Sequence, residues 1–142
     1  MTKRKLAPAK DWQNRNIEDY NVLTFTEYLK DAHKERFGID YAPFGGTWAM
    51  EQGILGDLIG TASRTNPKPR TASNEMVKRM IDEAFETYKP TDTYPGTSLG
   101  FTWHYRKEIW QRIQADELAK ARRQERQQAA EDVNYTKLGE WL

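Results

Sequence analysis

Hydrophobic residues recur at helical spacing through most of the chain, and no stretch shows the strict alternation expected of a half-buried strand. The clearest helical pattern lies in residues 74–88. Ser73 or Asn74 can cap its start, and Lys89-Pro90 ends it. Its apolar residues follow the i, i+3, i+4, i+7, i+8, i+11 spacing of a helix that buries one face: Val77, Met80, Ile81, Ala84, Phe85 and Tyr88.

Two earlier segments also predict helices. Thr24, followed three residues later by Glu27, forms a capping box ahead of a run of apolar positions that share one face. Gly38 can supply the left-handed residue that ends this helix, so we predict it over about residues 24–37. A second amphipathic pattern predicts a helix over residues 48–59.

The last third of the chain remains helical while its composition changes. Ser98 is a good cap for a long helix whose apolar face lasts to Ile113 or Leu118, and its charged continuation extends to about Val133. Leu118 is the only large apolar residue between positions 114 and 132. The fold class predicted is therefore all-α: a single small helical domain of about four helices, with a long charged C-terminal helix and a mobile basic N-terminal arm.

These patterns divide the chain into three parts. Residues 1–21 form the basic arm, residues 22–113 form the helical domain, and residues 114–142 form the charged helix and an apolar C-terminal peptide. Residues 60–73, rich in Thr, Ser and Pro and without an acidic residue, form a basic flap or linker inside the domain. The predicted core consists of Phe25, Leu29, Leu55, Ile59, Met80, Ile81, Phe85, Leu99, Trp103 and Trp110.

Composition narrows the class of protein. The 142 residues are 37% hydrophobic, 30% charged and 12% aromatic, which fits a compact aromatic core with polar extensions. The chain contains no Cys, so disulfides and thiolate zinc sites are excluded. No apolar run approaches the roughly 20 residues that a bilayer span needs, so no membrane association is expected.

The net charge of +1 conceals three basic regions. Residues 1–10 carry four cations and no acid, residues 60–73 carry three cations and no acid, and residues 104–126 carry seven cations against four acids. Flexible basic segments can contact phosphates and release counterions, so DNA is a candidate ligand. The candidate nucleic-acid contacts are Lys3, Arg4, Lys5, Arg64, Lys68, Arg70, Arg122 and Arg123.

Residues 94–106 hold the densest aromatic cluster of the chain. Aromatic residues at helical spacing are usually core, which makes this segment the central packing element of the domain. The alternative is an aromatic platform on which nucleic-acid bases stack.

Catalytic chemistry finds little support in the sequence. The two histidines, His33 and His104, are 71 positions apart and lack a nearby second ligand, so we expect no metal and no cofactor; His33 is expected on a solvated helix face. No nucleophile motif or phosphate-binding loop is present. We therefore expect no catalytic residue. A small Mg²⁺-dependent nuclease that uses Asp40 and Asp57 remains an alternative.

The chain ends on an apolar cluster after a polar stretch. Tyr135, Leu138, Trp141 and Leu142 follow residues 114–132, which as a helix would carry the terminus about 28 Å along its axis. Exposed Trp and Leu side chains are typical anchors for a groove on another protein. We therefore expect these four residues to bind a protein partner.

The eight residues Tyr135-Thr136-Lys137-Leu138-Gly139-Glu140-Trp141-Leu142 resemble the C-terminal sliding-clamp-binding peptide of T-even-type phage late-transcription coactivators and polymerases. In that family a Leu, followed closely by aromatic and aliphatic residues, enters a hydrophobic pocket on the clamp. Leu138, Trp141 and Leu142 would take those roles here, while Gly139 stands where the family tends to have an acid.

The resemblance implies a small phage-encoded accessory protein of transcription or replication that acts in the host cytoplasm. We expect a non-enzymatic factor that binds a polymerase, helicase or DNA and docks to a sliding clamp or another protein through its C-terminal peptide. The nuclease above and an inhibitor of a host protein remain alternatives, and the oligomeric state stays open.

Overall fold

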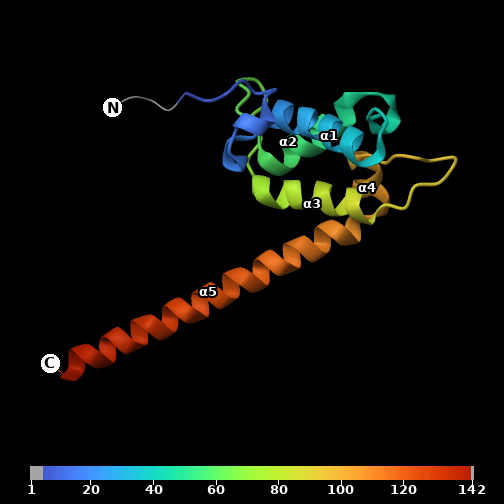
Figure 1. Cartoon of the computed structure of the whole chain (residues 1–142). Helices are drawn as coiled ribbons and strands as arrows, with labels where there is room; N and C mark the ends of the chain where they lie inside the picture. Colours follow the sequence, from blue (N-terminus) through green and yellow to red (C-terminus); the bar gives the residue numbers. More distant parts are fainter. Residues whose placement is uncertain (1–4, 142) are drawn as a thin grey trace. The chain divides into compact units, whose positions relative to one another are not determined.

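The computed structural model describes the backbone of residues 5–141 and the side chains of residues 5–139. Within these residues the protein is all-helical, as predicted, and its only β-type pairing is an isolated bridge between Thr61 and Lys68. The described residues contain three short 3-10 helices and five α-helices (Figure 1). In chain order the elements are η1 (Trp12–Asn14), η2 (Ile17–Asp19), α1 (Val22–Phe37), η3 (Phe44–Gly46), α2 (Trp48–Ile59), α3 (Asn74–Thr87), α4 (Leu99–Tyr105) and α5 (Lys107–Trp141).

The chain divides into two units, residues 1–110 and residues 111–142. We call the first unit the body; it contains every element up to the first turn of α5. The second unit consists of the rest of α5 and the C-terminal residue. No helix among the described residues has both the length and the apolar character needed to cross a membrane.

The core of the body forms where α1, α2, α3 and α4 contact one another. Of the ten predicted core residues, nine are buried. Trp103 is the exception, since it is only half-buried. Its ring lies beside that of Trp110, and the ammonium of Lys107 lies 4.0 Å from its ring centre. The predicted core list omitted several buried residues: Tyr20, Tyr28, His33, Glu51, Leu58 and Ile109. Val77, expected on the buried face of the helix over residues 74–88, is buried.

Two helix starts show how the local sequence sets the elements. The cap of α1 is Asn21, whose Oδ1 accepts the N–H of Thr24 at 2.9 Å, so the predicted capping box at Thr24 is wrong. Asn is as good a cap as Thr, and this start adds two residues to the helix. Ser73 caps α3 as predicted, through a hydrogen bond from the N–H of Met76 to its Oγ.

The predicted single helix from Ser98 is interrupted at Arg106. Ser98 does cap α4, but the backbone leaves the helical region at Arg106 (φ −132°, ψ 41°) and restarts as α5. The Arg106 guanidinium donates to the carbonyl of Ala84 at 3.0 Å and to Thr87 Oγ1 at 2.5 Å, which ties the break to the end of α3. Neither Pro nor Gly marks the position, so the break rests on tertiary contacts.

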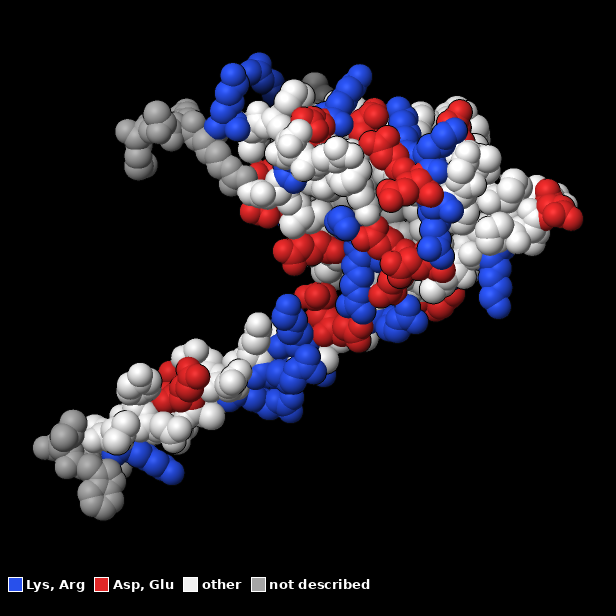
Figure 2. Space-filling model, in the orientation of Figure 1, with Lys and Arg blue, Asp and Glu red and all other residues white. Residues whose placement is uncertain are grey.

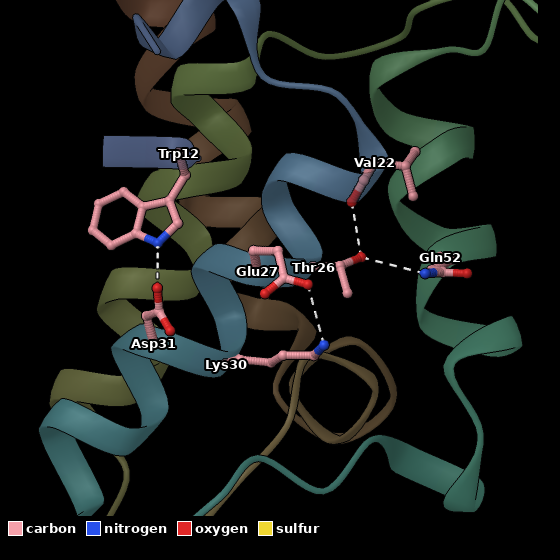
Figure 3. A network of polar contacts seen from close by, with 7 residues as sticks. All are labelled: Trp12, Val22, Thr26, Glu27, Lys30, Asp31 and Gln52. Carbon is pink, nitrogen blue, oxygen red and sulfur yellow. Dashed lines mark hydrogen bonds and ion pairs between the residues drawn. The ribbon is translucent and has the colours of Figure 1, made fainter. Parts of the chain in front are cut away.

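The described part of the predicted N-terminal arm packs against the body from Trp12 onward. The Trp12 indole lies edge-to-face against Tyr28, with ring centres 4.9 Å apart, and its Nε1 donates to Asp31 at 2.7 Å (Figure 3). Figure 3 also shows Gln52 of α2 donating to Thr26 of α1. Buried Asn74 adds hydrogen bonds to the carbonyls of Ile17 and Tyr20. This segment is therefore part of the body.

Candidate functional sites

A buried carboxylate organises one end of the body. Glu51 on α2 is 0% exposed and accepts three hydrogen bonds: from the Tyr41 hydroxyl at 2.5 Å, from the Phe44 N–H at 3.1 Å and from the Gly100 N–H at 2.9 Å. The Tyr41 oxygen in turn accepts the N–H of Leu99 at 2.8 Å. Glu51 therefore joins η3, α2 and the start of α4. It accepts hydrogen bonds from N–H groups at the starts of η3 and α4, which would otherwise be unpaired.

Tyr41 and Tyr28 are the two phenols whose pKa values are raised most by their surroundings in the body. Burial, followed by the charge of Glu51 and its hydrogen bond, raises the pKa of Tyr41 well above its ordinary value of 10.0. Burial and the hydrogen bond to Asp82 raise the pKa of Tyr28 in the same direction. Lys78 donates to the other oxygen of Asp82 at 2.8 Å. Both phenols therefore stay protonated at neutral pH and act as hydrogen-bond donors.

Gly100 lets the η3 segment lie directly on α4. A Cβ placed on Gly100 would come within 2.4 Å of the Cβ of Phe44, a distance that real side chains do not reach. The absence of a side chain at position 100 therefore sets how closely the Phe44 ring approaches α4. That ring also lies beside His104 and Tyr105, with ring centres 5.3 and 6.3 Å away.

These contacts form one wall of an apolar pocket of about 680 Å³ in the body. Its aromatic residues come from three parts of the chain: Phe44 from η3, Tyr88 and Tyr94 from the loop after α3, and Phe101 and Tyr105 from α4. Tyr94 and Tyr105 are each 68% exposed. We call this the aromatic pocket; its volume and lining are typical of a binding site.

The aromatic segment 94–106 therefore divides between the two interpretations that the sequence allowed. Leu99 and Thr102 are buried in the core, whereas Tyr94, His104 and Tyr105 are exposed, two of them in the pocket lining. The structure thus gives the segment both a packing role and an accessible aromatic surface.

The pocket lining also contains polar residues, among them Asp40, His33 and Thr97. His33 is buried, which corrects its expected place on a solvated face; its Nδ1 lies 3.1 Å from the Ile39 carbonyl and its Nε2 accepts the Thr97 N–H at 3.2 Å. This arrangement fits the neutral tautomer with the proton on Nδ1. The Thr97 hydroxyl is buried and has no hydrogen-bond partner among the described residues, so a polar group bound in the pocket could supply that partner.

The predicted basic flap is partly committed to internal contacts. Lys68 forms an ion pair with Asp57 at 2.7 Å, and Arg70 donates to Asn74 Oδ1 at 2.8 Å. Arg64 and Lys5 are exposed, while Lys3 and Arg4 lie outside the described residues. On the face of the body in Figure 2, acidic and basic side chains are interleaved. The flap therefore offers fewer available cations than the sequence suggested.

Asp40 and Asp57, the candidate carboxylates of the nuclease alternative, each face a lysine. Asp40 Oδ1 lies 3.3 Å from Lys34 Nζ in a largely exposed pair, and Asp57 pairs with Lys68. Over the described part of the chain, no three His, Asp or Glu side chains gather in a way that could hold a metal ion.

The second unit presents the remaining predicted residues. Arg122 and Arg123 are exposed on α5, and so are Tyr135 and Leu138, at 76% and 61%. The side chain of Trp141 and all of Leu142 lie outside the described residues. The backbone of α5 extends to Trp141, so Tyr135 and Leu138, three positions apart, share one face of a helix.

Comparisons with protein-family models, with curated proteins and with solved structures find no match to this chain. The candidate sites therefore rest on the residues and geometry given above.

Proposed function

We propose that this protein is a non-enzymatic accessory factor of transcription or replication, of the phage-encoded type, that docks to a protein partner through the C-terminal end of α5. The observation that carries the proposal is the exposure of Tyr135 and Leu138 on one face of a helix. The sequence continues with Trp141 and Leu142, so this end of the chain holds a Trp, a Tyr and two Leu within eight residues, the residue types that supply binding anchors.

The resemblance of residues 135–142 to a sliding-clamp-binding peptide supports a ring-shaped clamp as the partner. Because the backbone is helical to position 141, the apolar side chains would enter the partner's groove from one helix face. Attachment at this end would raise the effective concentration of the body near a polymerase or helicase without a strong contact of its own.

The body contributes the aromatic pocket to this function. Its lining is mainly apolar and includes the exposed rings of Tyr94 and Tyr105, which suits apolar side chains from the polymerase or helicase that the factor would contact. Tyr105 is 68% exposed, so Tyr105→Ala tests this contact with little effect on folding.

The test is affinity capture from a bacterial lysate by three chains, followed by mass spectrometry. The intact protein should retain a partner that a chain truncated after Asp132 loses. The matched control is Thr136→Ala, which changes the same turn of α5 at about 100° from Tyr135 and about 160° from Leu138 and should retain the partner. Equal capture by the truncated and intact chains would remove the C-terminal end of α5 as a docking site.

A further inference from the structure

The second unit carries a cluster of cations that is denser than that of the flap, residues 60–73. Between residues 118 and 130, α5 has four cations (Lys120, Arg122, Arg123 and Arg126) and one acid (Glu125), a net charge of +3. All four cationic residues are exposed, and none forms an ion pair within the described residues. Figure 2 shows blue side chains gathered on one stretch of α5.

The helix segregates these charges onto separate faces. At about 100° per residue, the four cations fall within about 160° of the circumference. Glu125, the one acid of this stretch, falls on the opposite side. Ala115, Ala119 and Ala130 lie on the same side of the helix as the cations, before and after them along the chain. We call this surface the cationic face of α5.

The cationic face carries internal repulsion. Lys120 and Arg123 are separated by three positions, Arg123 and Arg126 by three, and Arg122 and Arg126 by four. Neighbours at these spacings face each other on a helix, so each like-charged pair destabilises it. An anionic ligand along this face would remove the repulsion, so its binding should stabilise the helix locally.

We infer that the cationic face of α5 binds the phosphodiester backbone of nucleic acid. The stretch from Lys120 to Arg126 is about 9 Å long. Duplex DNA carries about one negative charge per 1.7 Å of axis, so about five phosphate charges match four cations over this length. Arginine, which supplies three of the four, binds phosphate through two parallel hydrogen bonds. The major groove of duplex DNA is wide enough to admit a single α-helix.

This inference rests on the proposed function for its biological setting, because a factor of transcription or replication works on nucleic acid. Its physical basis is separate from the C-terminal docking face. The inference also moves the predicted nucleic-acid contact from the flap to α5. Arg122 and Arg123 remain candidates, whereas Lys68 pairs with Asp57 and Arg70 donates to Asn74.

The experiment is a fluorescence-anisotropy titration of the full chain with short duplex DNA, single-stranded DNA and duplex RNA, at salt between about 50 and 200 mM. The test variant is Arg122→Gln/Arg123→Gln/Arg126→Gln, since Gln keeps a helix propensity close to that of Arg. The control is Lys34→Gln/Arg36→Gln/Lys89→Gln, which removes three exposed cations from the body. Circular dichroism verifies that both variants keep the helical content of the intact chain.

The intact and control chains should bind, and the triple arginine variant should bind at least about tenfold more weakly, with a salt slope smaller by about three. Hydrogen exchange of residues 118–130 should slow when nucleic acid is added to the intact chain. The three nucleic acids show which backbone is preferred. Absence of binding at low salt, or equal binding by the arginine variant, would overturn the inference. Polyglutamate that competes as well as nucleic acid would assign the face to an acidic protein.

Because capture of the protein partner depends on the C-terminal apolar face and this titration depends on the arginines, either result can fail alone. Loss of nucleic-acid binding with retained partner capture would leave the proposed docking intact.

Discussion

Replacing Glu51 should destabilise the body more than any other single change of a charged residue that we consider. In Glu51→Ala, three donors lose their acceptor: the Tyr41 hydroxyl and the N–H groups of Phe44 and Gly100. A buried donor without a partner costs about 1–3 kcal/mol. Tyr41 and Phe44 are half-buried, so water can reach them in part and their costs lie at the low end, whereas Gly100 is fully buried. We expect a total loss of about 3–5 kcal/mol.

The isosteric variant Glu51→Gln should lie between the intact protein and Glu51→Ala. Gln keeps one carbonyl acceptor but turns an amide donor toward groups that are themselves donors, so we expect a loss of about 1–3 kcal/mol. Glu86→Ala, at an exposed position on α3, is the control and should change stability by less than about 0.5 kcal/mol.

The assay is thermal unfolding followed by tryptophan fluorescence, because four of the five tryptophans lie in the body and α5 alone can keep helical signal after the body unfolds. A loss of about 3 kcal/mol should lower the melting temperature of a domain near this size by at least about 12 °C. If Glu51→Ala melts within about 2 °C of the intact protein, the three hydrogen bonds do not hold η3, α2 and α4 together.

Three further results are expected from the body. The pKa values of Tyr28 and Tyr41 are raised on folding, so the two phenols contribute their full stabilisation below the ordinary pKa of 10.0 and lose it as the pH rises above that value. The urea midpoint of the protein should therefore be level below about pH 10 and fall above it. The fall should be less steep in Tyr28→Phe, which lacks one of the two phenols. Gly100→Ala should cost about 1–3 kcal/mol through contact with Phe44, whereas Gly53→Ala, with no atom within 4 Å of the new Cβ, should be neutral or stabilising by urea unfolding. Ile81→Ala should cost about 2–5 kcal/mol by the same measurement, and unchanged stability would place Ile81 outside the core.

Hydrophobic periodicity predicted the helices well because the pattern is local. The α3 pattern marks a helix that buries a continuous stripe, and Val77, Met80, Ile81, Ala84 and Phe85 are all buried. The break at Arg106 had no such local marker. It depends on contacts of the arginine with the end of α3, which lies about twenty residues earlier in the chain.

The aromatic pocket was accessible to sequence reasoning only in part. The aromatic density of residues 94–106 marked one wall, but the other wall depends on how η3 lies against Gly100 and on the buried Glu51. A glutamate in an amphipathic pattern is expected to be exposed to solvent. Nothing in the local sequence shows that the Glu51 oxygens accept the N–H groups of Phe44 and Gly100. His33 was misplaced for the same reason, since both of its ring nitrogens find backbone partners outside α1.

The docking role of the C-terminal end of α5 is decided by one paired measurement on the variant Trp141→Ala/Leu142→Ala. Stability of the body and affinity for the captured partner are determined on the same preparation, by unfolding and by titration calorimetry. We expect stability to change by less than about 0.5 kcal/mol and binding to weaken by at least about 2 kcal/mol, a factor of about 30 in Kd. The reverse result, a large loss of stability with unchanged partner affinity, would show that these two residues serve folding and that the partner binds elsewhere.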